Sequence, residues 1–250
     1  MYNDRKEVFM KNKAIVVAAG SGSRMGGDIP KQFRELAGKP VICYCLETLE
    51  KSDHVDEVII VVSENYSDYC KREIKDKYGF SKVKSIIPGG EYRSESSAAG
   101  LKACGDDTNL VLIHDAARPF LTEKLIADGF ALAAEKGSAI AAVPCKDTIK
   151  IIDAREDPFA QKNSNFRRVV STPERSTLMA VQTPQAFKYK IISSAYERMT
   201  YEGMMTITDD ACAVEEMTVF DTWLYEGDPA NIKLTTPEDL EFAEWKMSRK

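Results

Sequence analysis

The chain has 250 residues, of which 44% are hydrophobic and 29% charged, and its formal net charge is −5. This length corresponds to one large domain or two small ones, with enough residues to bury a sizeable core. The mildly acidic charge argues against a nucleic-acid or anionic-membrane partner, although local basic clusters can still bind small anions. No apolar run approaches 18 residues, so no membrane span is expected.

The first residues and the cysteines indicate a cytoplasmic protein. Residues 1–12 are polar and lack the apolar stretch of a secretory signal, so we expect a disordered extension before a single domain at 13–250. The six cysteines form no C-x-x-C pair, and the two histidines lie far apart in sequence. A zinc finger and a disulfide scaffold are therefore excluded, and a reducing compartment is expected.

Apolar runs alternate with helical patterns through the first 145 residues. Continuous apolar runs, typical of strands covered on both faces, predict strands at 14–18, 58–62, 83–87, 110–113 and 139–143. Helical spacing predicts helices at 41–49, 66–78, 94–104 and 125–135, with Thr122 as an N-cap of the last. This alternation predicts an α/β fold in which a mainly parallel sheet is flanked by helices.

The alternation stops after residue 143. An extended stretch at 148–152, a polar turn-prone stretch and a second extended stretch at 166–171 predict a projecting β-hairpin arm over about 147–181. Such an arm has little core of its own and commonly needs a partner to cover it. A disordered surface loop is the alternative. Further on, we expect helices at 188–199 and 237–246 and a strand at 218–225.

A glycine-rich segment follows the first predicted strand: Ala18-Ala19-Gly20-Ser21-Gly22-Ser23-Arg24-Met25-Gly26-Gly27. Glycines at this point let backbone amides approach a phosphate at the carboxyl edge of a parallel sheet. The dinucleotide pattern G-x-G-x-x-G fails because Met25 stands at its last position, and the Walker pattern fails because Asp28 follows Gly27. The segment is therefore neither familiar loop.

Two cations, Arg24 and Lys31, stand in or just after this loop. A triphosphate carries about four negative charges near neutral pH, and charge-assisted contacts to it are worth roughly 1.5–3 kcal/mol each. The loop therefore favours nucleotide binding, with a solvated turn as the alternative.

Several short strings, in this order, resemble the 2-C-methyl-D-erythritol 4-phosphate cytidylyltransferase family over about residues 13–245. They are A-A-G-S-G-S-R-M…P-K-Q, Gly89-Gly90-Glu91-Tyr92-Arg93-Ser94-Glu95-Ser96, His114-Asp115-Ala116-Ala117-Arg118-Pro119, Asp147-Thr148-Ile149-Lys150, Gln182-Thr183-Pro184-Gln185, Thr208-Asp209-Asp210-Ala211 and Asn231-Ile232-Lys233. The resemblance implies a Rossmann-like α/β fold, transfer of CMP from CTP to a polyol phosphate with release of pyrophosphate, and a requirement for Mg²⁺. It also implies a homodimer joined through the β-arm.

The resemblance assigns roles to individual residues. Arg24 and Lys31 would stabilise the transition state, and Lys233 would position the attacking phosphate. Thr148 and Arg175 would contact the polyol phosphate from the arm of the other subunit. Nucleotide contacts would come from Ala18, Ala19, Gly20, Gly22, Gly90, Glu91 and Ser96.

The resemblance gives Asp115 two roles, contact with the polyol and assistance to Mg²⁺, and an ion pair with Arg118 is its structural alternative. Asp209 and Asp210 are expected either to bind the metal or to cap a helix. His114 is expected to be structural, because a phosphate nucleophile is already anionic near pH 7 and needs no general base.

Three other functions stay open. A ribitol-5-phosphate cytidylyltransferase shares the fold, but such enzymes usually have serine-valine in place of Ala116-Ala117. A non-catalytic nucleotide-sensing module and a structural dimerisation protein are the alternatives from other classes. This chain also departs from the family in about ten extra residues between Lys150 and Arg175, and in Glu91, where aspartate is more frequent.

Overall fold

The structure is a computed structural model that describes residues 9–20, 29–153 and 168–249, and its centre is a seven-stranded sheet of order β11-β7-β10-β6-β1-β4-β5. The strands are β1 (Lys11–Ala18), β4 (Glu57–Val62), β5 (Val83–Pro88), β6 (Thr108–Asp115), β7 (Ser138–Pro144), β10 (Met179–Lys188) and β11 (Leu224–Glu226). All pairs are parallel except those of β10, which runs antiparallel to β6 and β7. The α/β fold with a mainly parallel sheet is confirmed.

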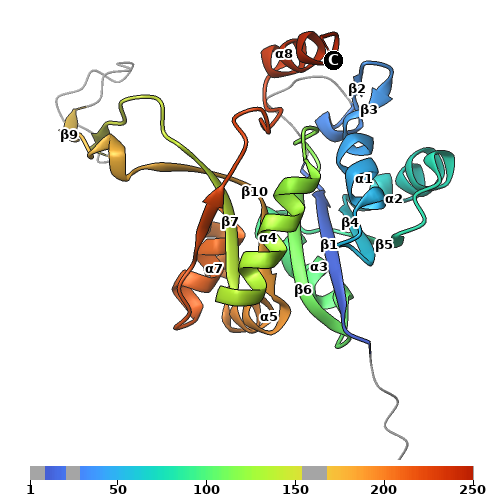
Figure 1. The fold of residues 1–250 in the computed structure, drawn as a ribbon, viewed down its shortest axis with the longest axis horizontal. Helices are drawn as coiled ribbons and strands as arrows, with labels where there is room; N and C mark the ends of the chain where they lie inside the picture. The colour runs from blue at the N-terminus through green and yellow to red at the C-terminus, as the bar shows by residue number, and fades with distance from the viewer. Residues whose placement is uncertain (1–8, 21–28, 154–167, 250) are drawn as a thin grey trace, which may run out of the picture.

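Helices cover both faces of this sheet (Figure 1). They are α1 (Val41–Lys51), α2 (Ser67–Tyr69), α3 (Arg93–Cys104), α4 (Glu123–Lys136), α5 (Tyr189–Arg198), α6 (Tyr201–Thr206), α7 (Asp210–Met217) and α8 (Pro237–Met247). Successive side chains of β1 point to opposite faces, so Val16 packs with α1 and α4 while Ile15 packs with α3, α5 and α7. The apolar runs of the sequence are therefore strands buried on both sides.

The N-terminal strand and the first helices depart in detail from the sequence expectations. β1 begins at Lys11, inside the segment expected to be a disordered extension, and Lys11 Nζ lies 2.6 Å from Glu57 Oε1. The helix expected at 66–78 is instead a short 3-10 turn (Glu64–Tyr66), α2 and a π-helix (Cys70–Asp76). A 3-10 turn (Lys31–Phe33) and a small hairpin of β2 (Glu35–Leu36) and β3 (Lys39–Pro40) precede α1.

The largest departures fall in the second half of the chain. The sequence pattern did not predict β10, because this strand carries polar residues and Pro184, and its pairing with β7 shifts between Val181 and Gln185. The strand expected at 218–225 is wrong over its first part, since β11 spans only Leu224–Glu226. Helix α6 was missed, as a short segment without a long apolar face, and α7 was anticipated only through its possible cap at Asp209 and Asp210.

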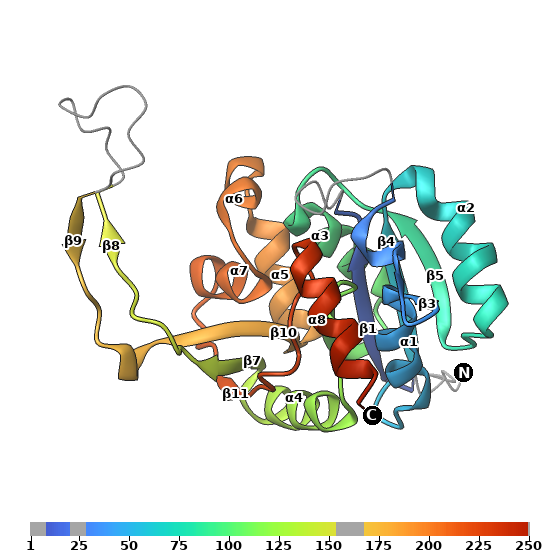
Figure 2. The ribbon, with the colours of Figure 1, turned by 90° about the horizontal axis from the view of Figure 1, so that it is seen from above.

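The predicted arm is present as a hairpin that projects far from the sheet (Figure 2). Its strands are β8 (Ile151–Ile152) and β9 (Val169–Ser171), paired antiparallel, and the strand expected at 148–152 therefore shortens to its last two residues. Residues 154–167, which include most of the polar stretch, lie outside the described residues. The arm leaves the sheet from the end of β7 and returns to it as β10.

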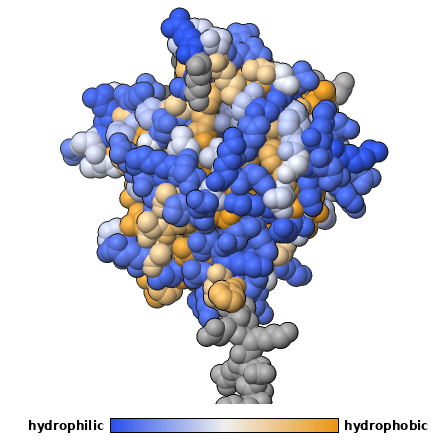
Figure 3. Space-filling view, turned by 45° about the vertical axis from the view of Figure 1, so that its right-hand side comes forward, coloured by the Kyte–Doolittle hydropathy of each residue, from blue (hydrophilic) through white to orange (hydrophobic). Residues whose placement is uncertain are grey.

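The outer surface matches the composition. The face displayed in Figure 3 is mostly hydrophilic, with hydrophobic side chains in separate patches. Within the described ranges, no helix is long and apolar enough to cross a bilayer.

Candidate active site

Three segments that the sequence analysis singled out meet at one edge of the sheet. Ala19 and Gly20 follow β1, Gly89 follows β5, and Asp115 is the last residue of β6. Because β1 pairs in parallel with β4 and β6, and β4 pairs in parallel with β5, the carboxyl ends of these strands lie at one edge of the sheet. The carboxyl edge of such a sheet is where α/β proteins bind their ligands.

The predicted nucleotide residues Ala19, Gly90 and Ser96 lie next to one another. A Cβ built at Gly89 would come within 2.6 Å of both Ala19 Cβ and Ser96 Oγ, so only glycine permits this close approach. Ser96 Oγ accepts a hydrogen bond from Gly90 N at 3.3 Å. Ala19, just after β1, therefore lies against the turn before α3.

The turn before α3 is fixed by Glu95. Its carboxylate accepts hydrogen bonds from the backbone N–H groups of Glu91, at 2.7 Å, and Tyr92, at 3.1 Å. These contacts cap the helix N-terminus and leave the Glu91 side chain exposed. The role of Glu91 in reading the nucleotide stays a prediction.

The turn that carries Lys31 is held at the end of β1 by the next residue in sequence, Gln32. Gln32 is buried, and its side-chain amide donates to the carbonyl oxygens of Ala18, at 2.5 Å, and Gly20, at 3.1 Å. These bonds tie the turn that carries Lys31 to the end of β1. The other two predicted loop residues, Gly22 and Arg24, lie outside the described residues.

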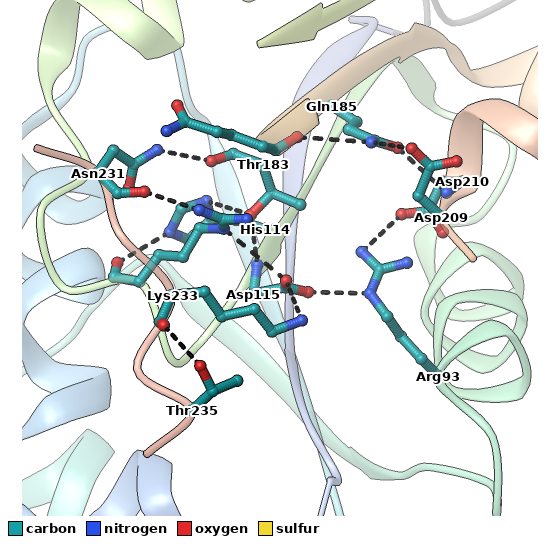
Figure 4. Close-up of polar contacts among 12 residues, drawn as sticks. Arg93, His114, Asp115, Thr183, Gln185, Asp209, Asp210, Asn231, Lys233 and Thr235 are labelled. Atoms are coloured by element: carbon teal, nitrogen blue, oxygen red, sulfur yellow. Dashed lines mark hydrogen bonds and ion pairs between the residues drawn. The ribbon is translucent and has the colours of Figure 1, made fainter. Parts of the chain in front are cut away.

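Asp115 is the centre of a charged cluster (Figure 4). Its Oδ1 is 2.9 Å from Arg93 Nε, and its Oδ2 is 2.8 Å from Lys233 Nζ. Arg118, which the sequence analysis considered as the partner of Asp115, is farther away, with 3.9 Å between its Nε and Oδ2. The structure therefore brings together Asp115 and Lys233, which the sequence had assigned separate roles. The expected ion pair with Arg118 is present, but the shorter contact of Arg93 adds a partner that the sequence did not predict.

The cluster keeps Asp115 ionised. Burial raises the pKa of this carboxyl, but the positive charges of Arg93 and Lys233 outweigh burial and hold the pKa well below its ordinary value. Burial lowers the pKa of Arg118, against the opposing charge of Asp115. Asp115 is therefore a carboxylate at neutral pH, available to bind cations or to accept hydrogen bonds.

A buried polar network supports the loop after β6. Thr183 Oγ1 accepts from Asp115 N at 3.0 Å and lies 3.2 Å from His114 Nδ1. Arg118 donates to the carbonyl of Asn231 at 2.7 Å, and the Asn231 amide donates to the carbonyl of Thr183 at 2.8 Å. Burial lowers the pKa of His114 to about 4, so this histidine is neutral at pH 7, as its expected structural role requires.

The two aspartates at the start of α7 have different roles. Asp209 is the N-cap of α7 and accepts from Cys212 N at 3.0 Å, which bears out the capping alternative. Asp210 is fully buried and pairs with Arg93 at 2.8 Å. In the described structure both carboxylates therefore already have protein partners: Asp209 has Cys212 N and Gln185, and Asp210 has Arg93.

The predicted arm residues lie away from the Asp115 cluster of the same chain. Thr148 and Arg175 are exposed on the arm, and Arg175 Nη1 donates to the carbonyl of Lys146 at 3.3 Å. The two residues therefore stand at the same part of the arm, while Figure 2 shows the arm extending away from the sheet.

The chemistry of Asp115 fits an Mg²⁺ ion held mainly by substrate. Among the described residues, no group of three or more histidine, cysteine, aspartate or glutamate side chains is arranged to hold a metal. Mg²⁺ commonly binds through one or two carboxylates, several waters and the phosphates of its nucleotide. An ionised Asp115, next to the carboxyl end of β1, meets that requirement.

Sequence reasoning missed Arg93, Gln32 and Thr183 as site residues. All three lie inside strings that the resemblance had marked, which was the only signal for them. Their roles depend on which distant segments they contact, and a single sequence does not contain this information.

Ala19 and Gly20 at the carboxyl edge of a mainly parallel sheet, together with Lys233 paired to an ionised Asp115 at the same edge, fit the class of nucleotidyltransferases. The family model described as "2-C-methyl-D-erythritol 4-phosphate cytidylyltransferase" matches residues 13–249. The chain belongs to this family. It is a cytidylyltransferase that uses CTP to cytidylylate 2-C-methyl-D-erythritol 4-phosphate, in the non-mevalonate pathway of isoprenoid synthesis.

Individual relatives agree with the family model. A 2-C-methyl-D-erythritol 4-phosphate cytidylyltransferase from Clostridium acetobutylicum is 44% identical over 238 residues, covering 95% of this chain and 98% of the relative. One from Alkaliphilus oremlandii is 41% identical and covers 95% of both. The crystal structure of 4-diphosphocytidyl-2C-methyl-D-erythritol synthase from Anaerococcus prevotii matches with a TM-score of 0.79 and 31% identity, covering 96% of this chain and 97% of that one.

Proposed function

We propose that the polyol phosphate binds at Lys233 and Asp115, beside a CTP triphosphate held by the loop after β1. The observation that supports this placement is the 2.8 Å contact between Lys233 Nζ and Asp115 Oδ2 at the carboxyl end of β6. The lysine side chain is about one-third exposed, and an ammonium group has three donors. One donor holds Asp115, and the others remain for a phosphate.

The reaction needs charge stabilisation more than proton transfer. A phosphate oxygen of the acceptor attacks the α-phosphorus of CTP, a new P–O bond forms, and the bond to the β-phosphate breaks to release pyrophosphate. The nucleophile has a second pKa near 6 and is already anionic at pH 7. The neutral, buried His114 is accordingly not required as a base.

Lys31 and Arg24 stabilise the charge that develops on the transferred phosphorus and on the departing pyrophosphate. Cations and backbone amides perform this function in phosphoryl transfer generally. Gln32 ties the turn that carries Lys31 to the carbonyl oxygens of Ala18 and Gly20. Bound Mg²⁺, with Asp115 as its protein ligand, would neutralise charge on the triphosphate.

Substrates of this family are CTP and a polyol phosphate, and the arm supplies the remaining acceptor contacts from a second subunit. Large apolar side chains are exposed along the arm and its base: Ile149, Ile151, Ile152, Val169, Val170, Met179 and Val181. Such a surface, on a hairpin with little core of its own, requires a partner for burial. In the homodimer, Thr148 and Arg175 would reach the acceptor bound by the other subunit.

A pyrophosphate-release assay tests the proposed acceptor. We expect release with CTP, Mg²⁺ and 2-C-methyl-D-erythritol 4-phosphate, and only background release with no acceptor. Faster release with ribitol 5-phosphate would contradict the acceptor assignment. Binding of CTP without release with either acceptor would contradict catalysis itself.

Mixed dimers test whether the arm acts on the neighbouring site. Lys31→Ala subunits are combined with Thr148→Ala subunits, and heterodimers are isolated by two affinity tags. If the arm works across the dimer, one of the two sites is intact, and about half of the wild-type activity returns. Heterodimers no more active than the parent variants would show that Thr148 does not act across the interface.

A further inference from the structure

Arg93 connects two carboxylates that lie on different parts of the fold. Its Nε is 2.9 Å from Asp115 Oδ1, at the end of β6, and its Nη2 is 2.8 Å from Asp210 Oδ2, at the start of α7. Figure 4 shows the guanidinium lying between them. The two negative charges raise the pKa of Arg93 well above its ordinary value, although burial opposes this. One side chain therefore links the end of β6, where the acceptor is proposed to bind, to the start of α7.

The far end of this connection is anchored firmly. Asp210 is fully buried, and its Oδ1 accepts a hydrogen bond from Tyr196 of α5 at 2.7 Å. The backbone N–H groups of Asp210 and Ala211 each donate to Gln185 Oε1 at 3.1 Å. The carboxylate that holds Arg93 is thus fixed by groups from α5, α7 and β10.

The near end fixes the orientation of Asp115. Arg93 contacts Oδ1 of this carboxylate and Lys233 contacts Oδ2, so one cation on each oxygen holds the plane of the carboxylate. Without Arg93, Asp115 could rotate toward Lys233 and engage more of its donors. The lysine would then have fewer donors for a phosphate.

We propose that Arg93 is a positioning residue for the acceptor phosphate, acting through Asp115 and Lys233, with Asp210 and Tyr196 as its anchor. The proposal rests on the placement of the polyol phosphate at Lys233. Arginine is required because its planar fork contacts two carboxylates at once. Lysine at this position would keep the charge but could hold only one of them in the observed geometry.

Steady-state kinetics of Arg93→Lys, Asp210→Asn and Tyr196→Phe test the proposal. For Arg93→Lys and Asp210→Asn we expect KM for the polyol phosphate to rise about tenfold, while KM for CTP changes less than twofold. Tyr196→Phe, which removes only one contact to the anchor, should raise the acceptor KM about two- to threefold. The Arg93→Lys, Asp210→Asn double variant should be no worse than the poorer single variant, because both act through one connection.

A matched control separates positioning from general stability. Lys13 is another buried cation, with its Nζ 2.6 Å from Asp107 Oδ1, and it lies at the opposite end of β1 from the glycine loop. Lys13→Met should lower the melting temperature at least as much as Tyr196→Phe and leave both KM values unchanged. If Lys13→Met shifts the acceptor KM as Arg93→Lys does, the effect is structural and the proposal is overturned.

Lys233→Met separates the placement of the acceptor phosphate at Lys233 from the positioning role of Arg93. If this variant raises the acceptor KM and Arg93→Lys, Asp210→Asn and Tyr196→Phe do not, Arg93 has no positioning role and the placement of the acceptor stands. If Lys233→Met leaves the acceptor KM unchanged, the acceptor lies elsewhere and both ideas are overturned. Equal increases in KM for CTP and for the acceptor in Arg93→Lys would also contradict a role specific to the acceptor.

Discussion

The Asp115 cluster is buried and held by many contacts, whereas the arm is exposed and held by few. Asp115 contacts Arg93 and Lys233 with both oxygens, and the chain around it is buried and linked by hydrogen bonds to several separate elements. The arm pairs only over the short strands β8 and β9 and exposes large apolar side chains along its described length.

This difference separates two tasks. Charge stabilisation depends on groups whose positions are fixed before substrate binds, and the cluster provides such groups within one chain. The arm lies away from the cluster of its own chain, and in the proposed homodimer it would contribute contacts to the neighbouring site. We therefore expect changes at the sheet edge to alter chemistry or stability, and changes on the arm to alter association.

The largest expected effect is at the glycine loop. Lys31→Ala should lower kcat by on the order of 10²-fold, because it removes a cation from the transition state. Arg24→Ala should have a comparable effect. Gln32→Ala should reproduce part of the loss by releasing the turn that carries Lys31. Single-turnover pyrophosphate release measures the chemical step, and wild-type rates in both cation variants would contradict the assigned roles.

The second effect concerns His114 and pH. Its pKa of about 4 in the folded chain lies below its value of 6.5 in the unfolded chain, so the unfolded state takes up a proton first as pH falls. Its contribution to stability is complete above pH 6.5 and decreases by about 2–3 kcal/mol by pH 4.5. Denaturant unfolding across this range should show a flatter pH dependence for His114→Gln. The exposed His54→Gln is the control and should behave as wild type.

A smaller effect is expected at Gly89. A side chain there would meet Ala19 and Ser96 at 2.6 Å, so Gly89→Ala should cost about 1–3 kcal/mol through overpacking and weaken binding of CTP. Gly129→Ala is the control, because a Cβ at Gly129 of α4 would meet Tyr225 Oη at 2.9 Å, a comparable overpacking at a residue with no role assigned in nucleotide binding. Titration of CTP against both variants checks this. Equal binding by the two would show that the close approach at Gly89 is not needed for nucleotide binding.

The smallest effect on folding is expected on the arm. Val170→Asp replaces an exposed apolar residue, so the free energy of unfolding should change by less than about 0.5 kcal/mol. Its association should nevertheless weaken, because the charge would be buried between subunits. Sedimentation velocity over a dilution series measures this, with the exposed Val219→Asp as a control away from the arm. A dimer equally stable in both variants would exclude Val170 from the interface.

The first half of the fold could be predicted from sequence because its strands are continuous apolar runs. Residues 14–18 and 58–62 read as buried strands, and both lie within strands of the central sheet. In contrast, β10 carries Gln182, Thr183 and Gln185, whose polar side chains are buried in the network around the site. A buried polar strand has no apolar pattern, so periodicity did not find it.

Only part of the site could be predicted, because contacts between remote segments leave no local pattern in the sequence. Asp115 and Lys233 were found through short strings, and the structure joins them at 2.8 Å. Arg93 was not assigned a role, because its value depends on Asp210, more than a hundred residues away. Propensity and spacing describe neighbours in sequence, whereas an ion pair between remote segments depends on the folded chain.

The way the arm is attached has a consequence for changes in its length. Met179–Val181 of β10 pair with Ala142–Pro144 of β7, so the hairpin is closed at its base by the main sheet itself. Beyond a closed base, doubling a connecting segment costs only about 0.6 kcal/mol in closure entropy. We therefore expect the core to tolerate insertions and deletions in the arm, and an arm exchanged between relatives to leave the catalytic edge intact.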